Sequence, residues 1–331
     1  MKPSIKLDSA TARPAASARP GRLNYAGLVL LPLLLAMGVA FRVAGIDKKL
    51  YWHDEAYTSL RASGYTADEA IAHLFTGDEI GIADIQKYQR YAAEKGLRDT
   101  ISSLVTEDSE HPPFYFLLVR LWMKWFGDSP GIVRGLSVIF SLLVFPSLYW
   151  LCMELFGSRA TAWTAVALMA VSPFHVLFAQ EARQYSLWAL TILVSSAALL
   201  RARRLPAKLN WGAYAVAATL GLYTHLFFGF VLVAHALYMA ANEGLRLSRT
   251  MMSYALACFA SLLAFSPWIV LLIQDFNRIV AANEWAYVEA DLSYLIDSWI
   301  LYFSSPFVDY SSGGLAGSLM RVSALALAAC S

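Results

Sequence analysis

Long runs without a charged side chain alternate along this sequence with short polar segments. Five such runs contain 17 to 25 residues each: 23–41, 135–153, 160–180, 184–200 and 250–274. A helix needs roughly 20 mainly apolar residues to cross the hydrocarbon core of a bilayer. The pattern therefore predicts an all-α polytopic membrane protein.

A sixth apolar run, 209–242, contains 34 residues without a charge. As one helix it would be about 51 Å long, which is too long for a single crossing. We expect two short spans hinged near Gly221–Gly229. The full set of predicted spans is then about 24–43, 131–153, 160–179, 184–200, 209–225, 227–243 and 250–273. The run 312–331 is interrupted by Arg321 and is expected to be an incomplete last span, which leaves open whether the chain is a fragment or a truncated gene product.

Composition supports the membrane assignment. The chain is 58% hydrophobic and 15% charged, whereas soluble domains carry about a quarter of their residues as charges. A soluble enzyme, a disordered chain and a nucleic-acid binder are therefore excluded. The three cysteines are an odd number and two lie in or beside apolar runs, so we expect free thiols rather than a disulfide framework.

The charge distribution predicts the orientation. Residues 1–22 carry five basic side chains against one acidic one, and we expect them to form a disordered cytoplasmic tail. The first span that follows is expected to be uncleaved, because no small-residue cleavage site follows the apolar run. Segment 45–112 holds thirteen acidic and seven basic residues, and it belongs to an outer loop, 45–130. The acidic segment 274–311 is also expected outside. The transmembrane module is 23–331.

Counting crossings singles out the segment 113–126. The basic cluster at Arg201–Lys208 should lie inside, so an odd number of crossings must separate it from the tail. Segment 113–126 is too short to span and places Arg120 and Lys124 on one face among aromatic residues. It is therefore predicted to be an amphipathic helix lying at the outer interface.

Polar residues near the outer ends of the spans form four groups. The first follows span one and contains Asp54, Glu55, Tyr57 and Arg61; if it is helical, Asp54, Thr58 and Arg61 share a face. The alternative is that the two acids merely cap a helix and favour its dipole.

The other groups are shorter. His111 precedes a Pro-Pro pair, where helix capping is the alternative role. Gln180, Glu181, Arg183 and Tyr185 occupy a tight turn, where charges also serve as membrane anchors, and His225 lies among aromatics and could be a packing residue. His175 and His235 fall within predicted spans and are read as structural.

The predicted topology brings the four groups to one membrane face. Such a layer offers carboxylates for general base catalysis, cations for a phosphate and aromatic rings for sugar stacking.

The ordered motifs WHDEAYT, EHPPFYFLLVRLWMKWFGDS, LFGSRATA, SPFHVLFAQEARQYSLWAL and LYTHLFF resemble the bacterial GT-C membrane glycosyltransferases. The nearest group is the glycosyltransferase family 39 type, related to protein O-mannosyltransferases and aminoarabinose transferases. The resemblance covers about 24–245. It implies a GT-C-like helix bundle in a bacterial inner membrane that transfers a sugar from a polyprenyl-phosphate donor to a hydroxyl of a protein, lipid or glycan on the periplasmic face.

The resemblance also implies residue roles. The family's acidic pair falls on Asp54 and Glu55, with Asp54 as the general base of an inverting transfer, and its later acid falls on Glu181. The donor phosphate is expected at His111, Arg183 and Arg61. The substrate is expected to contact Tyr57, Gln180, Tyr185 and His225. No cofactor is required, although Asp54 and Glu181 could share a divalent metal.

Two other functions remain open at this stage. A truncated, non-catalytic subunit would bind the lipid-linked sugar without turnover. A transporter of lipid-linked sugars would be expected to carry charges along a path within its spans, and the charge-free runs make this the weaker alternative. Neither the sugar nor the oligomeric state can be read from the sequence.

Overall fold

The computed structural model describes residues 25–244, 246, 248–284 and 291–308. These residues form fifteen α-helices and one 3-10 turn, and no strand among them, which confirms the predicted all-α class. The predicted basic tail 1–22 and the predicted incomplete span 312–331 lie outside the described residues.

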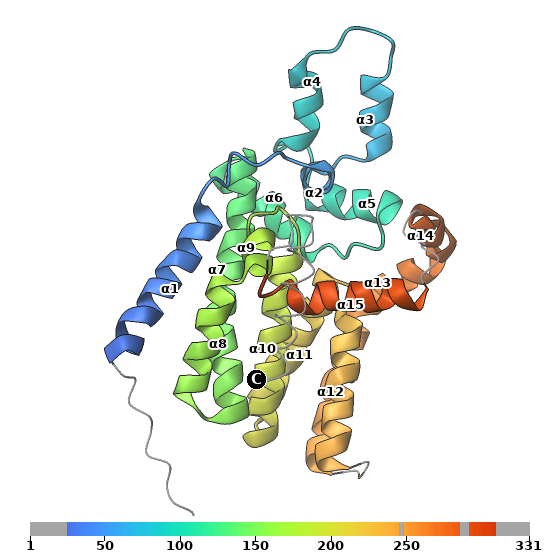
Figure 1. The fold of residues 1–331 in the computed structure, drawn as a ribbon. Helices are drawn as coiled ribbons and strands as arrows, with labels where there is room; N and C mark the ends of the chain where they lie inside the picture. The colour runs from blue at the N-terminus through green and yellow to red at the C-terminus, as the bar shows by residue number, and fades with distance from the viewer. Residues whose placement is uncertain (1–24, 245, 247, 285–290, 309–331) are drawn as a thin grey trace, which may run out of the picture.

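The helices divide into a bundle and an outer group (Figure 1). The bundle contains α1 (Tyr25–Val43), α7 (Pro130–Phe156), α8 (Arg159–Val171), α9 (Pro173–Ala179), α10 (Tyr185–Arg204), α11 (Lys208–Thr224), α12 (Phe228–Glu243) and α13 (Arg249–Gln274). The outer group is α2 (His53–Ser63), α3 (Ala67–Leu74), α4 (Ile82–Gln86), η1 (Lys87–Gln89), α5 (Leu97–Glu107) and α6 (Phe114–Phe126). After α13 follow α14 (Phe276–Ala282) and α15 (Leu292–Ser304).

By length and composition, three described helices can cross a membrane: α7, α10 and α13. The pair α8 and α9 makes a fourth if it is counted as one bent span. These helices support a multi-pass membrane protein. The count of seven spans remains a prediction, because α1, α11 and α12 are apolar but shorter in the described structure.

The segment predicted as one continuous span, 160–179, is broken. The axes of α8 and α9 differ by 61°, and Ser172 between them has an extended backbone with ψ 120°. Pro173 explains the break, because a proline excludes the helical conformation from the residue before it. The bend directs the turn at 180–184 toward the other outer elements.

The apolar stretch 209–242 forms two helices, α11 and α12, which meet at residues 225–227. Close packing at this junction depends on Gly221, because a Cβ at that position would overlap the ring of Phe228. Phe228 itself is fully buried. The junction therefore holds His225 at a fixed outer position.

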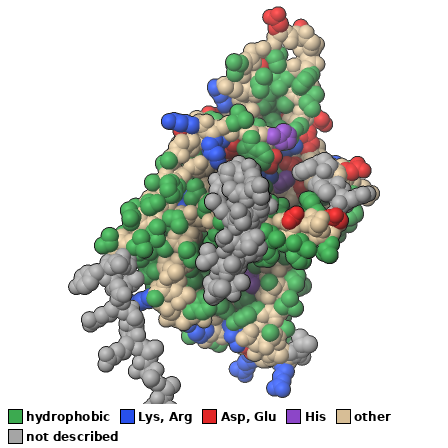
Figure 2. All heavy atoms as spheres, viewed as in Figure 1, with side chains coloured by type: hydrophobic (Ala, Val, Ile, Leu, Met, Phe, Trp, Pro, Cys, Tyr) green, Lys and Arg blue, Asp and Glu red, His purple; other side chains and the backbone are tan. Residues whose placement is uncertain are grey.

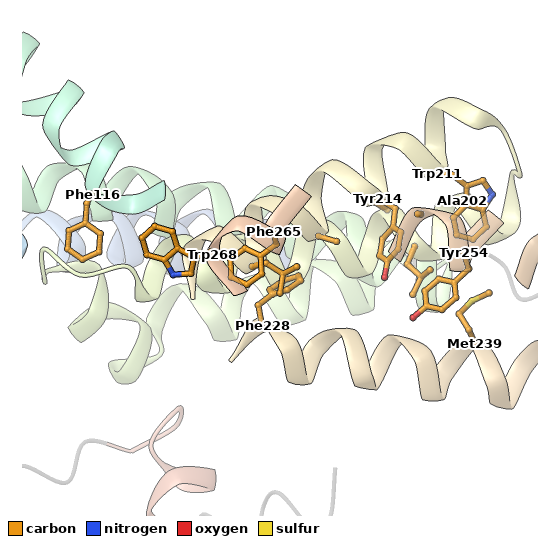
Figure 3. Packing of buried hydrophobic residues seen from close by; sticks show 14 of the residues in the cluster. Phe116, Ala202, Trp211, Tyr214, Phe228, Met239, Tyr254, Phe265 and Trp268 are labelled. Atoms are coloured by element: carbon orange, nitrogen blue, oxygen red, sulfur yellow. The ribbon is translucent and has the colours of Figure 1, made fainter. Parts of the chain in front are cut away.

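A long aromatic cluster joins α10, α11, α12 and α13. Figure 3 shows Phe116 and Trp268 at one end of it and Trp211, Tyr254 and Met239 at the other. Interiors packed this densely transmit displacement from one element to the next. The cluster thus connects the bundle to α5 and α6, which carry part of the outer polar layer.

Segment 113–126 forms the helix α6, and its two basic residues differ in environment. Lys124 is exposed, but Arg120 is 3% exposed and donates hydrogen bonds to the carbonyls of Ala62, Ser63, Ala92 and Lys95. Arg120 therefore does not contribute to an exposed basic face, and the interfacial position of this helix stays a prediction. Its guanidinium binds backbone groups of the outer loop, which a sequence pattern along one helix does not reveal.

The first helix is fixed by a charged residue at its outer end. Arg42 is completely buried and donates to the Ser141 hydroxyl at 2.8 Å and to the Ala170 carbonyl at 2.6 Å. Gly38 permits this contact, because a Cβ there would collide with Ala170. Helix α1 is thereby bound to α7 and α8.

Candidate functional site

Three segments far apart in sequence meet at the outer end of the bundle. They are the start of α2, the segment between α5 and α6, and the turn between α9 and α10. They bring together three of the predicted site residues, Asp54, His111 and Arg183. The Nη2 atom of Arg183 lies 3.2 Å from Nε2 of His111 and 3.6 Å from Oδ2 of Asp54.

Arg183 is buried but loosely held. Its other contacts are the Asp54 carbonyl at 3.5 Å and the Thr58 hydroxyl at 3.4 Å, and its Nε has no partner among the described residues. Charge-assisted hydrogen bonds are normally about 2.7–2.9 Å long. The guanidinium therefore keeps donors available for an anion.

His111 is oriented from behind by Asp108. Its Nδ1 lies 2.6 Å from Oδ1 of Asp108. A guanidinium can only donate, so Nε2 of a neutral His111 accepts from Arg183 and the proton resides on Nδ1. Burial raises the pKa of the Asp108 carboxyl, but the hydrogen bond and charge of His111, together with Arg61 and Arg183, lower it below its ordinary value.

Arg61 lies next to Glu107 and Asp108 rather than next to Arg183. It is 3% exposed, donates from Nη1 to Glu107 at 2.6 Å, and has its Nε 3.6 Å from Asp108. Glu107 also accepts from the backbone amides of Ala67 and Asp68. Arg61 thus stabilises Asp108 and the outer loop, and it does not join the cluster of Asp54, His111 and Arg183 directly.

Glu55 is buried in a different environment from its neighbour Asp54. Glu55 has no exposed surface, and its two oxygens accept from Nε and Nη2 of Arg134 at 2.7 and 2.6 Å. It also accepts from the amide of Ala182 at 2.8 Å. The side chain of Asp54, in contrast, is 30% exposed. The contacts of Glu55 are those of a positioning residue that ties α2 and α7 to the turn carrying Arg183.

Four of the remaining predicted residues occupy the edges of this site. The amide nitrogen of Gln180 donates to the carbonyls of Phe41 and Ala44, so it binds the end of α1. Tyr57 is 37% exposed and packs against His53. Tyr185 and His225 lie beside Arg183: the guanidinium is 5.9 Å from the Tyr185 ring, whose centre is 6.4 Å from that of His225.

Glu181 is adjacent to this cluster and partly buried. Burial raises the pKa of its carboxyl above the ordinary value, and the charges of Glu55 and Asp54 add to that effect against Lys49 and Arg183. A carboxyl in this position can exchange a proton closer to neutral pH than a solvated one.

A known family matches part of the chain. Residues 110–271, just under half of the sequence, match the dolichyl-phosphate-mannose-protein mannosyltransferase family. This segment is therefore similar to that mannosyltransferase family. The match agrees with the resemblance found in the sequence and supports a membrane glycosyltransferase of the type that uses a lipid-phosphate sugar donor. No curated protein sequence matches the chain.

The matched range differs from the region of resemblance, 24–245. It includes His111, Glu181 and Arg183, but it begins after Asp54 and Glu55. The mannosyltransferase match therefore does not cover Asp54 and Glu55, and their place in the site rests on the geometry of the structure. The 3.6 Å approach of Asp54 to Arg183 connects it with the matched region.

One group of side chains could approach a cation. Ligand atoms of Asp108, Glu110 and His111 lie within 4.8 Å of one another. Both ring nitrogens of His111 already have partners, however, and Arg61 and Arg183 lie beside Asp108 and His111. These two fixed positive charges make the position a poor fit for a metal ion and a good one for an anion.

Sequence reasoning missed two residues of the site. Asp108 lies three residues before His111, a spacing typical of neighbouring side chains on a helical turn, and this signal could have been used. Arg134 directly precedes the apolar run 135–153, so its place in the sequence indicates only the boundary of a span. Its partner Glu55 is 79 residues earlier, and only the folded structure reveals that pairing.

Proposed function

We propose that this chain transfers a sugar from a polyprenyl-phosphate donor to a hydroxyl acceptor at the extracytoplasmic face of the membrane, with inversion. The observation that carries the proposal is the state of Arg183. It is a buried cation between Asp54 and His111, and every contact it makes with their side chains is 3.2 Å or longer. A monophosphate ester would supply the acceptors that this guanidinium does not find in the protein.

The chemistry is a single displacement. Asp54 takes the proton of the acceptor hydroxyl as its oxygen attacks the anomeric carbon, and the bond from that carbon to the phosphate oxygen breaks. Polyprenyl phosphate leaves with an added negative charge, which Arg183 stabilises. His111 accepts from Arg183 at Nε2 and is held by Asp108 at Nδ1, so it positions the guanidinium beside the phosphate.

Glu181 has a second role in this proposal. Its position beside Asp54 and Arg183, inferred from their mutual electrostatic effects, suits it to orient the sugar by hydrogen bonding. We assign Glu55 no contact with the substrate, because both of its oxygens already accept hydrogen bonds from Arg134 and Ala182. The proposed reaction requires no metal.

An apolar groove next to the site supports a polyprenyl donor. It has a volume of about 1030 Å³ and lies between α6, α7, α10 and α11. Phe114 and Leu187 line it close to His111 and Arg183, and Lys208 lines it at the other end of α11. From Leu220 to Lys208 the helix extends about 18 Å, which is enough to accommodate several isoprene units along the bundle.

The charge distribution supports the proposed orientation. In Figure 2, acidic side chains gather at the upper end and the right edge of the molecule, and basic side chains lie at its lower end and also on the upper left. The basic residues Arg201 and Arg204, with Glu154, lie at the end of α10 opposite the site. Basic segments face the cytoplasm in most membrane proteins, and this rule supports an extracytoplasmic position for Asp54, His111 and Arg183.

The test is turnover of a labelled donor by purified protein in lipid nanodiscs. Wild-type protein should convert polyprenyl-phosphate-[³H]mannose, or the glucose or aminoarabinose counterpart, into polyprenyl phosphate and a glycosylated acceptor. Asp54→Asn should bind the donor normally and transfer about 10²–10⁴-fold more slowly. Near wild-type transfer by a folded Asp54→Asn protein would refute the base assignment, and donor binding without turnover by wild type would favour the non-catalytic subunit.

A further inference from the structure

Three polar side chains at the outer end of α10 carry buried atoms that find no hydrogen-bond partner in the described part of the chain. The atoms are Nε of Arg183, Oε1 of Gln184 and Nε1 of Trp188. Gln184 is 2% exposed and Arg183 is 7% exposed. Leaving such an atom unpaired is unfavourable, so a cluster of three indicates a place where a polar ligand binds.

The three side chains follow one another along the chain from the phosphate site into α10. Gln184 and Trp188 are four residues apart at the start of α10, and so they lie on the same face. Trp188 stacks on His225, with ring centres 4.3 Å apart and planes 15° apart. Tyr185 lies between Arg183 and His225. The surface therefore begins where Arg183 meets His111.

His225 adds a donor to this surface. Its Nδ1 accepts a hydrogen bond from the amide of Phe227 at 3.2 Å, so the proton of the neutral ring resides on Nε2. Burial, followed by the charges of His111 and Arg183, lowers the pKa of His225 to about 4. The ring is therefore neutral at physiological pH.

The chemistry of this surface matches a neutral, hydroxyl-bearing ring. It presents an amide oxygen as an acceptor, indole and imidazole N–H groups as donors, and flat aromatic faces. Beyond Arg183 the groups of this surface are uncharged, whereas Glu181, which the proposed function assigns to the sugar, can accept from one of its hydroxyls. A sugar has hydroxyls that both donate and accept, and apolar ring faces that pack on aromatic side chains.

We propose that Gln184, Trp188 and His225 form the subsite that binds the sugar of the lipid-linked donor, through hydrogen bonds to its hydroxyls. The inference rests on the proposed function, because it places the sugar next to the phosphate held by Arg183. It assigns specificity for the sugar to the first turns of α10 and to the junction of α11 and α12. Asp54 then approaches the anomeric carbon from the other side of Arg183.

The experiment measures equilibrium binding in nanodiscs of two probes, polyprenyl phosphate and its mannosyl ester, with glucosyl and aminoarabinosyl esters as alternatives. Trp188→Phe keeps an aromatic ring against His225 but removes the N–H group. We expect it to weaken binding of the preferred sugar ester about 2- to 10-fold, the equivalent of one hydrogen bond, and to leave binding of polyprenyl phosphate unchanged. Gln184→Met, a change of similar length, tests the acceptor in the same way if Trp188→Phe does not insert.

Trp150→Phe is the matched control, because its indole donates to Glu154 at 3.1 Å and lies at the opposite end of the bundle. It should change neither affinity. Equal weakening of both probes by Trp188→Phe and Gln184→Met would show a structural role and overturn the subsite. Unchanged binding of the sugar ester would also overturn it while the phosphate site stands. Failure of wild-type protein to bind either probe would instead overturn the proposed function.

Discussion

Two adjacent acids, Asp54 and Glu55, should respond to mutation in opposite ways. Glu55 is fully buried and pairs with Arg134, which is 1% exposed. Removing one partner of a buried ion pair typically costs about 3–5 kcal/mol, because the other charge remains buried. Arg134 would keep the carbonyls of Ile46, Lys49 and Leu50 at 2.7–3.1 Å. We therefore expect Glu55→Ala to lower the free energy of unfolding by a value near the lower limit, about 3 kcal/mol.

Asp54→Asn should change that free energy by less than about 1 kcal/mol, because its side chain is 30% exposed and its charge lies 3.6 Å from Arg183. Transfer should nevertheless be lost. The assay is equilibrium unfolding in lipid–detergent micelles followed by tryptophan fluorescence, with transfer measured on the same preparations. A double-mutant cycle of Glu55→Leu with Arg134→Met should show a coupling of about 1–3 kcal/mol. Stability unaffected by Glu55→Ala, or strongly reduced by Asp54→Asn, would refute this division of roles.

Three further predictions concern the surroundings of the site. Trp268→Phe removes the hydrogen bond to the Ser109 carbonyl, which is 3.0 Å long. It should reduce kcat/KM about 3- to 10-fold by loosening the segment that carries His111. Substitution of the exposed Trp299 by Phe is the control, and equal kcat/KM values for the two variants would contradict the role of Trp268. Because the pKa of His225 falls from 6.5 to about 4 on folding, the unfolded chain binds a proton in that range that the folded one does not. Stability should therefore decrease as the pH is lowered from about 6.5 to about 4, and His225→Phe should flatten this dependence; an unchanged slope would argue against it. A chelator such as EDTA should leave transfer unchanged, because Arg61 and Arg183 already supply positive charge, whereas loss that Mn²⁺ restores would show a metal requirement.

The sequence alone was sufficient to predict that Asp54, His111 and Arg183 lie at the same end of the molecule. Apolar run lengths and charge counts determine on which end each polar group falls, and helices of fixed rise then bring the groups together. The motif order supplied a resemblance to a family, and the match over 110–271 agrees with that resemblance. Both inferences use information that is local in sequence.

Contacts between distant segments could not be predicted in this way. Whether Glu55 is catalytic or structural depends on Arg134, and whether Arg61 reaches a phosphate depends on Glu107 and Asp108. A carboxylate or guanidinium has the same appearance in sequence whether it is saturated by partners or available to a ligand. The bend at Ser172–Pro173, in contrast, had a local signal in the proline.

The central claim is that Arg183, positioned by His111, holds the phosphate of a lipid-linked sugar beside Asp54. A structure of the protein with a non-hydrolysable polyprenyl-phosphonate sugar bound would test it most directly. We predict phosphonate oxygens within hydrogen-bond distance of the Arg183 guanidinium, with the hydrocarbon chain in the groove lined by Phe114 and Leu187. A phosphonate bound instead at the opposite end of α10, on Arg201 and Arg204, would contradict the account.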